Sequence, residues 1–182
     1  YEDVAEEDYA VSEEVADQVE DSSLLADSLA YENLQYTVNG DSITITGCDE
    51  DATSLTIPAQ IDEKNVVAIQ DYAFNERSNL TSLTIPEGVT SLGYYMICGT
   101  RISSITIPST VTSSRSNGTN GALAGCPTLT LVTFAPGTKK IPDYICASSS
   151  QTSYVQTVTI PDSVEEIGYS AFYNCVNLTG GI

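Results

Sequence analysis

Histidine and tryptophan are missing from the sequence, and only six of its 182 residues are lysine or arginine. Without histidine, neither a Ser-His-Asp nor a Cys-His nucleophilic system can be built, and an HExxH metal site is equally excluded. The 25 acidic residues bring the net charge to −19, which disfavours nucleic acids and anionic membrane surfaces because both would repel the chain. No apolar run approaches the roughly 18 residues of a membrane span, so we expect no membrane insertion.

Cysteine is also scarce, and its arrangement argues against a metal site or a complete set of disulfides. Five cysteines cannot all pair within one chain, none belongs to a CxxC motif, and no histidine is available to complete a zinc site. Cys126 and Cys175 each stand three residues before a leucine. We expect buried thiols that act as small hydrophobic side chains, with disulfide or metal binding as the less favoured alternatives. No cofactor is expected.

The two ends of the sequence predict a chain that has been processed or trimmed. The first residue is Tyr1, and no basic segment followed by an apolar one is present, so we expect a signal peptide to have been removed already. Residues 177–182 stop where an earlier repeat would continue to Ile-Pro, and we therefore expect the last repeat to be incomplete.

An acidic segment, residues 1–33, differs in composition from all that follows. Its first 32 residues hold 12 aspartates and glutamates and no lysine or arginine. Such a block is usually a solvated tail or linker. Apolar residues at helical spacing after an N-cap residue, Ser22 or Ser23, predict a helix over about 22–33, and we expect the remainder to be flexible or weakly helical.

A β-hairpin is predicted over residues 34–47. Two stretches of alternating apolar and polar residues flank Asn39-Gly40, a pair that favours a tight hairpin turn. The hairpin would cap a stack of repeats, since the first coil of a solenoid otherwise exposes its core.

Residues 48–182 repeat one phrase, Leu-Thr-Ile-Pro, in about five copies. The apolar residue before the proline position recurs at intervals of 28, 22, 27 and 26 residues, a period typical of solenoids. The five marker residues are Ile57, Ile85, Ile107, Phe134 and Ile160. One coil cannot bury its apolar face alone, whereas stacked coils bury it continuously.

Each coil is predicted to have three parts. A strand such as 83–85 alternates apolar side chains inward with polar ones outward, and the proline after it ends the ladder. A second short strand follows. The third part is rich in aromatic residues, as in 71–74 and 169–172, and predicts a short helix or 3-10 turn with Phe74 and Phe172 in the core.

The stretch VTIPDSVEEIGYSAFYNCVNL, from Val158 to Leu178, resembles the BspA-type leucine-rich repeats of bacterial surface proteins. The resemblance covers about residues 34–182. It implies a repeat solenoid, a leucine-rich-repeat-like, β-rich, right-handed coil of short strands and short helical or 3-10 turns with an N-terminal β-hairpin cap. It also implies a secreted or cell-surface-attached bacterial protein, in a family with members implicated in adhesion to host matrix proteins or to other bacteria.

Three departures from the family pattern predict irregular coils in the middle of the array. Residues 95–98 replace the expected Ala-Phe, the polar stretch 113–121 replaces the pattern of the second strand, and 148–153 contains an insertion.

No set of residues predicts catalysis. Residues 49–51, and the pair Glu165 and Glu166, are candidates for acid and base carboxylates, but adjacent carboxylates in a strand point to opposite faces and those in a loop are usually solvated. Residues 49–51 also lack the spacing of an EF-hand calcium loop. We therefore expect neither an enzyme nor a metal site.

The predicted binding face is a row of hydroxyls on the outer side of the repeated strand: Thr56, Thr84, Thr106, Thr133 and Thr159. Hydroxyls in register on a sheet can hydrogen-bond a partner, although β-branched polar residues also suit any exposed strand position. Ice-binding solenoids carry similar threonine rows, but the unequal coil lengths here argue against ice.

The polar loop that contains Ser116, Asn117 and Asn120 is a second candidate, because loops on a rigid scaffold often carry function. Together these features predict a non-enzymatic, monomeric, extracellular interaction module, a bacterial adhesin or scaffold. Its partner would be a protein of the host matrix or of a bacterial surface. The alternative is a structural spacer, the stalk of a larger surface protein in which binding occurs elsewhere.

Overall fold

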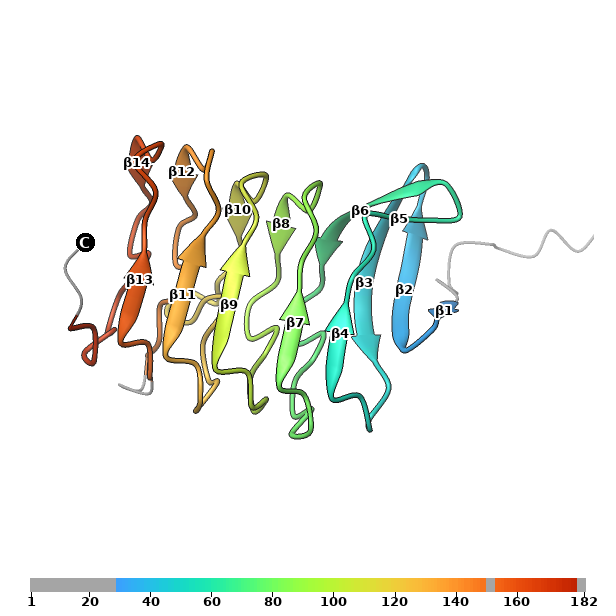
Figure 1. The fold of residues 1–182 in the computed structure, drawn as a ribbon, viewed down its shortest axis with the longest axis horizontal. Helices are drawn as coiled ribbons and strands as arrows, with labels where there is room; N and C mark the ends of the chain where they lie inside the picture. Colours follow the sequence, from blue (N-terminus) through green and yellow to red (C-terminus); the bar gives the residue numbers. More distant parts are fainter. Residues whose placement is uncertain (1–28, 150–152, 180–182) are drawn as a thin grey trace, which may run out of the picture.

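The computed structural model of the protein describes residues 29–149 and 153–179. Fourteen strands and no helix occur in these residues. None of their segments has the length and apolar character of a membrane-spanning helix. The coils stack side by side along one axis, from the strands of the N-terminal cap at one end to β14 at the other (Figure 1).

Five short parallel strands, one from each coil, form the first face of the solenoid (Figure 1). They fall into two ladders, one of β4 with β7 and one of β9 with β11 and β13. Their bounds are β4 (Ser54–Thr56), β7 (Ser82–Thr84), β9 (Ser104–Ile107), β11 (Leu131–Phe134) and β13 (Thr157–Thr159).

The second strand of each coil lies on the second face. β6, β8 and β10 pair in parallel within the sheet that begins at the cap, and β12 pairs in parallel with β14. A short strand, β5, turns back and pairs antiparallel with β6. The bounds are β5 (Gln60–Ile61), β6 (Lys64–Ile69), β8 (Ser91–Leu92), β10 (Ser113–Ser114), β12 (Lys140–Ile141) and β14 (Glu166–Ile167).

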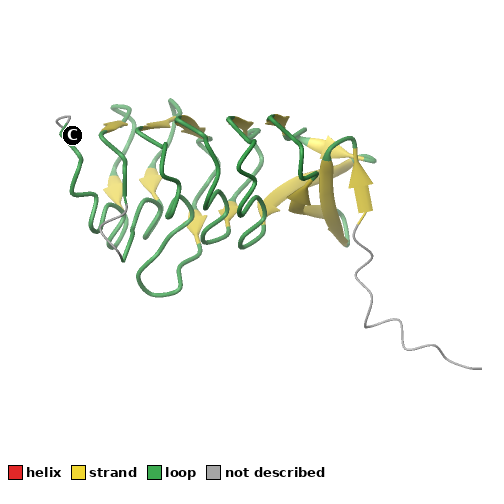
Figure 2. Ribbon diagram, turned by 90° about the horizontal axis from the view of Figure 1, so that it is seen from below, coloured by secondary structure: helices red, strands yellow, loops and turns green. Residues whose placement is uncertain are grey.

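Three antiparallel strands, β1 (Leu29–Tyr31), β2 (Leu34–Asn39) and β3 (Ser42–Cys48), close the N-terminal end of the stack. β2 and β3 form the predicted hairpin, and Gly40 has the left-handed conformation that a tight turn favours, with a φ of 62°. β3 then runs parallel to β6 and so joins the cap to the first coil. Figure 2 shows the strands of the cap at one end of the row of coils. The hairpin cap is thus confirmed.

The helix predicted over 22–33 is wrong for the part that the structure describes. Residues 29–31 form β1, which pairs antiparallel with β2 and places Tyr31 opposite Leu34. A tight turn joins the two strands, and Glu32 within it has a φ of 52°. Pairing with the edge of the cap satisfies the peptide groups of this segment, and that tertiary gain outweighs a local helical preference. Residues 22–28 lie outside the described residues.

The core lies between the two faces and consists of the apolar residues that alternate along the strands. Residues of the repeated phrase stack from coil to coil and are at most 7% exposed in the strands from β4 to β13: Leu55, Ile57, Leu83, Ile85, Ile105, Ile107, Val132, Phe134 and Val158. The predicted solenoid is confirmed. Phe74 is fully buried as expected, whereas Phe172 is only partly buried.

The aromatic-rich segments are successive turns rather than the short helix or 3-10 turn predicted. Their peptide groups bond to the neighbouring coil: the Phe74 N–H donates to the Met96 carbonyl at 2.8 Å, and the Cys146 N–H donates to the Ala171 carbonyl at 2.8 Å. Tyr72 has a φ of 57°, which a right-handed helix does not allow. Because these peptide groups are used between coils, they are not available for hydrogen bonds within a helix.

Glycine is required where one turn approaches the next most closely. A Cβ atom at Gly121 would lie 1.6 Å from the Tyr144 carbonyl oxygen, and one at Gly93 would lie 2.2 Å from the Asp71 nitrogen. A larger residue at either position would push adjacent coils apart.

The polar stretch 113–121 retains the second strand that its side chains do not predict. Ser113 and Ser114 form β10, which pairs in register with Ser91 and Leu92 of β8. The ladder consists of main-chain hydrogen bonds, so it continues through a coil whose side chains have lost the apolar pattern.

A carboxylate fastens the second coil to the third. Glu87 accepts hydrogen bonds from the Ser109 N–H at 3.1 Å, the Ser109 hydroxyl at 3.0 Å and the Thr110 N–H at 3.3 Å. Burial alone would raise the pKa of Glu87, but these hydrogen bonds outweigh burial and hold the pKa below its ordinary value.

Replacing Glu87 with alanine is expected to lower the free energy of unfolding at neutral pH by about 1 kcal/mol, a modest loss because the carboxylate is exposed. Its pKa is lower in the folded than in the unfolded state. The contribution is therefore complete above the unfolded pKa and is lost as pH falls through the folded pKa. Urea unfolding of both proteins should show a difference that shrinks in acid. Glu50→Ala, in an exposed turn, is the control, and an equal loss in that variant would contradict the assignment.

Replacing Phe74 with alanine is expected to lower the free energy of unfolding by about 3–5 kcal/mol, since the fully buried ring would leave a cavity. The same change at Phe172 should cost clearly less because that ring is only partly buried. Denaturant unfolding of the two variants measures the contrast. Similar losses would show that the two rings fill equivalent core positions.

Candidate functional site

The candidate site is the outer surface of the first face, where hydroxyls point away from the core. Four of the five predicted threonines are exposed, and Thr133 is half-buried. Strand register aligns Thr56 with Thr84 and, separately, Thr106 with Thr133 and Thr159. The structure therefore brings the five together in two rows rather than in one.

This face carries no charge of its own. The five strands contain only serine, threonine and apolar residues, although the net charge of the protein is −19. A partner that docks here would meet hydroxyl groups, which donate and accept hydrogen bonds, rather than carboxylates.

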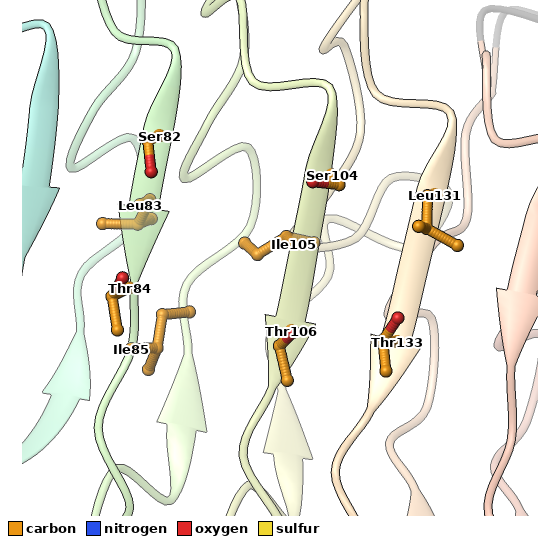
Figure 3. Close-up of a pocket in the computed structure, with 9 residues that line it drawn as sticks. All are labelled: Ser82, Leu83, Thr84, Ile85, Ser104, Ile105, Thr106, Leu131 and Thr133. Carbon is orange, nitrogen blue, oxygen red and sulfur yellow. The ribbon is translucent and has the colours of Figure 1, made fainter.

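A gap between β7 and β9 divides the two rows. The ladder of β7 runs to β4 and the ladder of β9 runs to β11, and within the described ranges no ladder joins β7 to β9. Each of the two strands therefore turns one edge, with its peptide N–H and C=O groups, toward the gap. Figure 3 shows β7 and β9 on either side of this gap, with labelled side chains of both strands and of the neighbouring β11.

One missing residue in the second coil accounts for the gap. In the first, third and fifth coils, three residues separate a turn residue of positive φ from the next leucine. In the second coil only two, Thr100 and Arg101, separate Gly99 from the equivalent Ile102.

The shorter turn shifts the hydrogen bonds that lead into β9. At the other junctions the residue before the strand donates to its equivalent in the preceding coil, as the Thr81 N–H does to the Thr53 carbonyl at 2.9 Å. Here the Arg101 N–H donates to the Leu80 carbonyl at 2.9 Å instead, and no backbone hydrogen bond of the described residues joins Ser103 to Thr81. β9 consequently does not continue the ladder of β7.

A groove with a volume of about 380 Å³ runs over β7, β9 and β11 and includes this gap. The polar residues that line it are Ser82, Thr84, Ser104, Thr106 and Thr133. Four aliphatic residues also border it: Leu131 is half-buried, whereas Leu83, Ile85 and Ile105 belong to the core and are at most 7% exposed (Figure 3). Three of these threonines are predicted from the sequence, but the groove is not, and its only sequence signal is the residue missing after Gly99.

The predicted loop residues build the loop itself. The Asn117 side-chain oxygen accepts from the Asn120 N–H at 3.0 Å, and the Ser116 hydroxyl accepts from the Gly118 N–H at 2.9 Å. Asn120 is only 4% exposed, and its side-chain oxygen accepts from the Ser149 N–H at 2.8 Å. Asn120 therefore ties this loop to the next coil, while Ser116 and Asn117 reach the solvent.

The acidic residues considered for catalysis do not converge. Residues 49–51 lie in an exposed turn, Glu165 pairs with Lys139, and Glu166 pairs with Lys140 at 2.7 Å. The hydrogen bond to Glu166 raises the pKa of Lys140. In the part of the chain that the structure describes, no three cysteine, aspartate or glutamate side chains gather closely enough to hold a metal ion.

Tyrosine rings fasten the turns of neighbouring coils. The rings of Tyr72 and Tyr95 stack with centroids 5.6 Å apart, and Tyr94 meets Tyr72 edge-on at 5.0 Å. Burial, together with the neighbouring Tyr94 hydroxyl, raises the pKa of Tyr72. Tyr144 and Tyr169 form a similar edge-on pair at 5.5 Å between the fourth and fifth coils. Such pairs add to the packing between coils.

All five cysteines are free thiols. Cys126 is buried as predicted, with its sulfur 3.4 Å from the Ile102 carbonyl oxygen, whereas Cys175 is half-buried and lies 3.4 Å from the Cys146 carbonyl oxygen. Burial raises the pKa of Cys146 well above its ordinary value. A thiol that stays protonated is a poor nucleophile, so Cys146 serves packing.

A family model described as BspA type leucine rich repeat region matches residues 47–179 in six copies. No curated protein matches the chain. Among solved structures, a leucine rich repeat protein of T. pallidum is 24% identical, with a TM-score of 0.65, and the match covers 84% of this chain and 70% of that one. A leucine-rich repeat protein of Bacteroides ovatus is 18% identical, with a TM-score of 0.52. That match covers 82% of this chain but only 45% of the relative. Both likenesses show the fold.

Replacing Asn120 with alanine is expected to lower the free energy of unfolding by about 1–2 kcal/mol, because the Ser149 N–H loses its partner in a partly buried hydrogen bond. Ser116→Ala, which removes one hydrogen bond near the loop surface, is the matched control and should cost less. Denaturant unfolding and amide hydrogen exchange at Ser149 measure the effect. Unchanged exchange at Ser149 in the Asn120 variant would contradict the assigned role.

Proposed function

The chain belongs to the BspA-type leucine-rich repeat family, and from this premise we propose that it is a non-enzymatic protein-interaction module, an adhesin or scaffold of a bacterial cell surface. The observation that carries the proposal is the first face. It presents two rows of threonine hydroxyls in register, on strands that contain no charged residue.

The geometry of this face suits a partner with a broad and fairly flat surface. Parallel ladders within each row hold the strands in fixed register, so the hydroxyls need little ordering when a partner docks. Each hydroxyl both donates and accepts, which lets one row pair with either kind of polar group.

The partner we propose is a protein of the host matrix or of a bacterial surface, bound by a monomer of this chain outside the cell. A net charge of −19 argues against nucleic acid and anionic lipid. The strands of the first face carry no charged residue, so a partner that docks there meets hydroxyl groups rather than carboxylates.

A structural spacer is the second candidate. Exposed β-branched polar residues are favourable at strand positions without any ligand, and the interlocked coils would form a stiff stalk. The two candidates differ in one respect: a spacer has no saturable partner on the first face.

Changing Thr84, Thr106 and Thr133 together to lysine is expected to weaken binding to a matrix protein by about tenfold or more. Three unpaired charges would then be buried at the centre of the interface. The measurement is surface plasmon resonance of the whole chain against immobilised fibronectin, fibrinogen, laminin and collagen at two salt concentrations.

The control replaces Gln70 and Ser78, two exposed residues outside the strands of the first face, with lysine. It adds positive charge elsewhere and should leave affinity within about twofold. Equal losses in both variants would indicate a general charge effect. No saturable binding of the unchanged chain to any of these proteins would favour the spacer.

A further inference from the structure

The groove between β7 and β9 combines three features that no other part of the first face shares. Two strand edges point peptide groups into it. Hydroxyls from three strands line it, and the threonine methyl groups with the half-buried Leu131 side chain contribute apolar carbon. Its lining contains no charged and no aromatic side chain.

We infer that this groove binds an uncharged saccharide segment of one or two sugar rings. A sugar ring presents hydroxyls around its edge and C–H groups on its faces. The hydroxyls of Ser82, Thr84, Ser104 and Thr106 and the peptide groups of both strand edges match the first feature, because each can donate to or accept from a sugar hydroxyl. The threonine methyl groups and the half-buried Leu131 side chain match the second feature.

The spacing of the strands disfavours an inserted peptide strand. A third strand between β7 and β9 would require them to lie about 9.5 Å apart, twice the normal distance between neighbours. Cα atoms of the two strands approach within 8 Å. The gap is thus too narrow for another strand, although it interrupts the direct ladder.

The electrostatics disfavour a charged ligand. An anionic sugar or sulfated glycan would find no lysine or arginine in the groove and would approach a protein of net charge −19. A cationic ligand would find no carboxylate in the lining. Burial of an unpaired charge of either sign is costly.

The size of the groove limits the ligand to a short segment. A volume of about 380 Å³ lies near the lower end of the roughly 300–1,000 Å³ of small-ligand sites. The groove also opens onto the face, so a longer glycan can extend beyond it. This inference does not depend on the proposed protein partner, since free saccharides test it directly.

The test is a titration of the isotopically labelled full chain, followed by amide NMR shifts. The probes are maltose, cellobiose and di-N-acetylchitobiose. A heparin disaccharide is the charged comparison, and a blocked Thr-Val-Thr-Val-Thr peptide is the strand comparison. We expect at least one neutral sugar to shift the amides of Leu83, Ile85, Ser104 and Thr106 saturably, with a dissociation constant of about 1–10 mM.

Two variants link the binding to the groove. Thr84→Val with Thr106→Val removes two hydroxyls at nearly constant volume and should weaken binding about tenfold or more. Thr112→Val with Thr179→Val, two exposed threonines outside the strands of the first face, is the matched control and should bind normally. Insertion of one asparagine after Thr100 restores the three-residue turn, should close the ladder and should abolish binding.

The inference is overturned if no neutral sugar shifts the groove amides, or if the Thr84 and Thr106 double variant binds as well as the control pair. It is also overturned if the peptide or the heparin disaccharide shifts those amides at lower concentration than every neutral sugar. Because the double variant changes only exposed side chains, it tests the groove even if the insertion prevents folding. Failure of the matrix-protein experiment leaves this result unaffected, and the converse also holds.

Discussion

Stacking of equivalent residues from coil to coil is the constraint on which the structure depends. Leu83 and Ile85 are buried because the neighbouring coils cover them, and each such side chain contributes roughly 1.5–3 kcal/mol only when that cover exists. Every position that touches a neighbouring coil is therefore restricted. Gly93 and Gly121 leave room for the adjacent turn, and Glu87 reaches across to the next coil. The same constraint explains why the turns share their peptide hydrogen bonds between coils rather than closing them within helices.

The second coil shows how the stack accommodates a residue that is missing. Ile102 remains fully buried, and the second face keeps its ladder from β8 to β10, so the shortage is confined to the outer edge at β7 and β9. This is the least costly place for it. A peptide group freed on a solvent-exposed face exchanges its partner for water at a net cost of about 1 kcal/mol. Loss of contacts around a buried isoleucine would cost several times more. Water or a ligand in the groove can therefore form hydrogen bonds with the peptide groups that the missing residue leaves without a ladder partner.

The repeated phrase predicts the fold well because burial on one side of a strand leaves a direct pattern in the sequence, as Ile57, Ile85 and Ile107 show. Asn39-Gly40 predicts the cap hairpin for a similarly local reason. The strand at 29–31 is not predictable, because its conformation depends on pairing with the edge of β2 rather than on the pattern of its own side chains. The threonine rows follow from the alternation, but their division does not. The division of the rows depends on how many residues separate Ile102 from the preceding turn residue of positive φ. A positive φ is only weakly encoded by residue type, so its position is hard to predict from the sequence.

The charge of the protein is distributed unevenly, and the strands of the first face carry none of it. Twelve acidic residues lie within residues 1–32, and on the second face Glu165 and Glu166 are neutralised by lysines of the preceding coil. Repulsion of anionic partners by the remaining charge acts over about a Debye length, roughly 8 Å at physiological salt, and so precedes any contact. A partner docked on the neutral strands, as proposed, would be recognised by hydroxyl and peptide hydrogen bonds rather than by charge. On this proposal, charge would determine which molecules approach the solenoid, and the register of its coils would determine which of them fit.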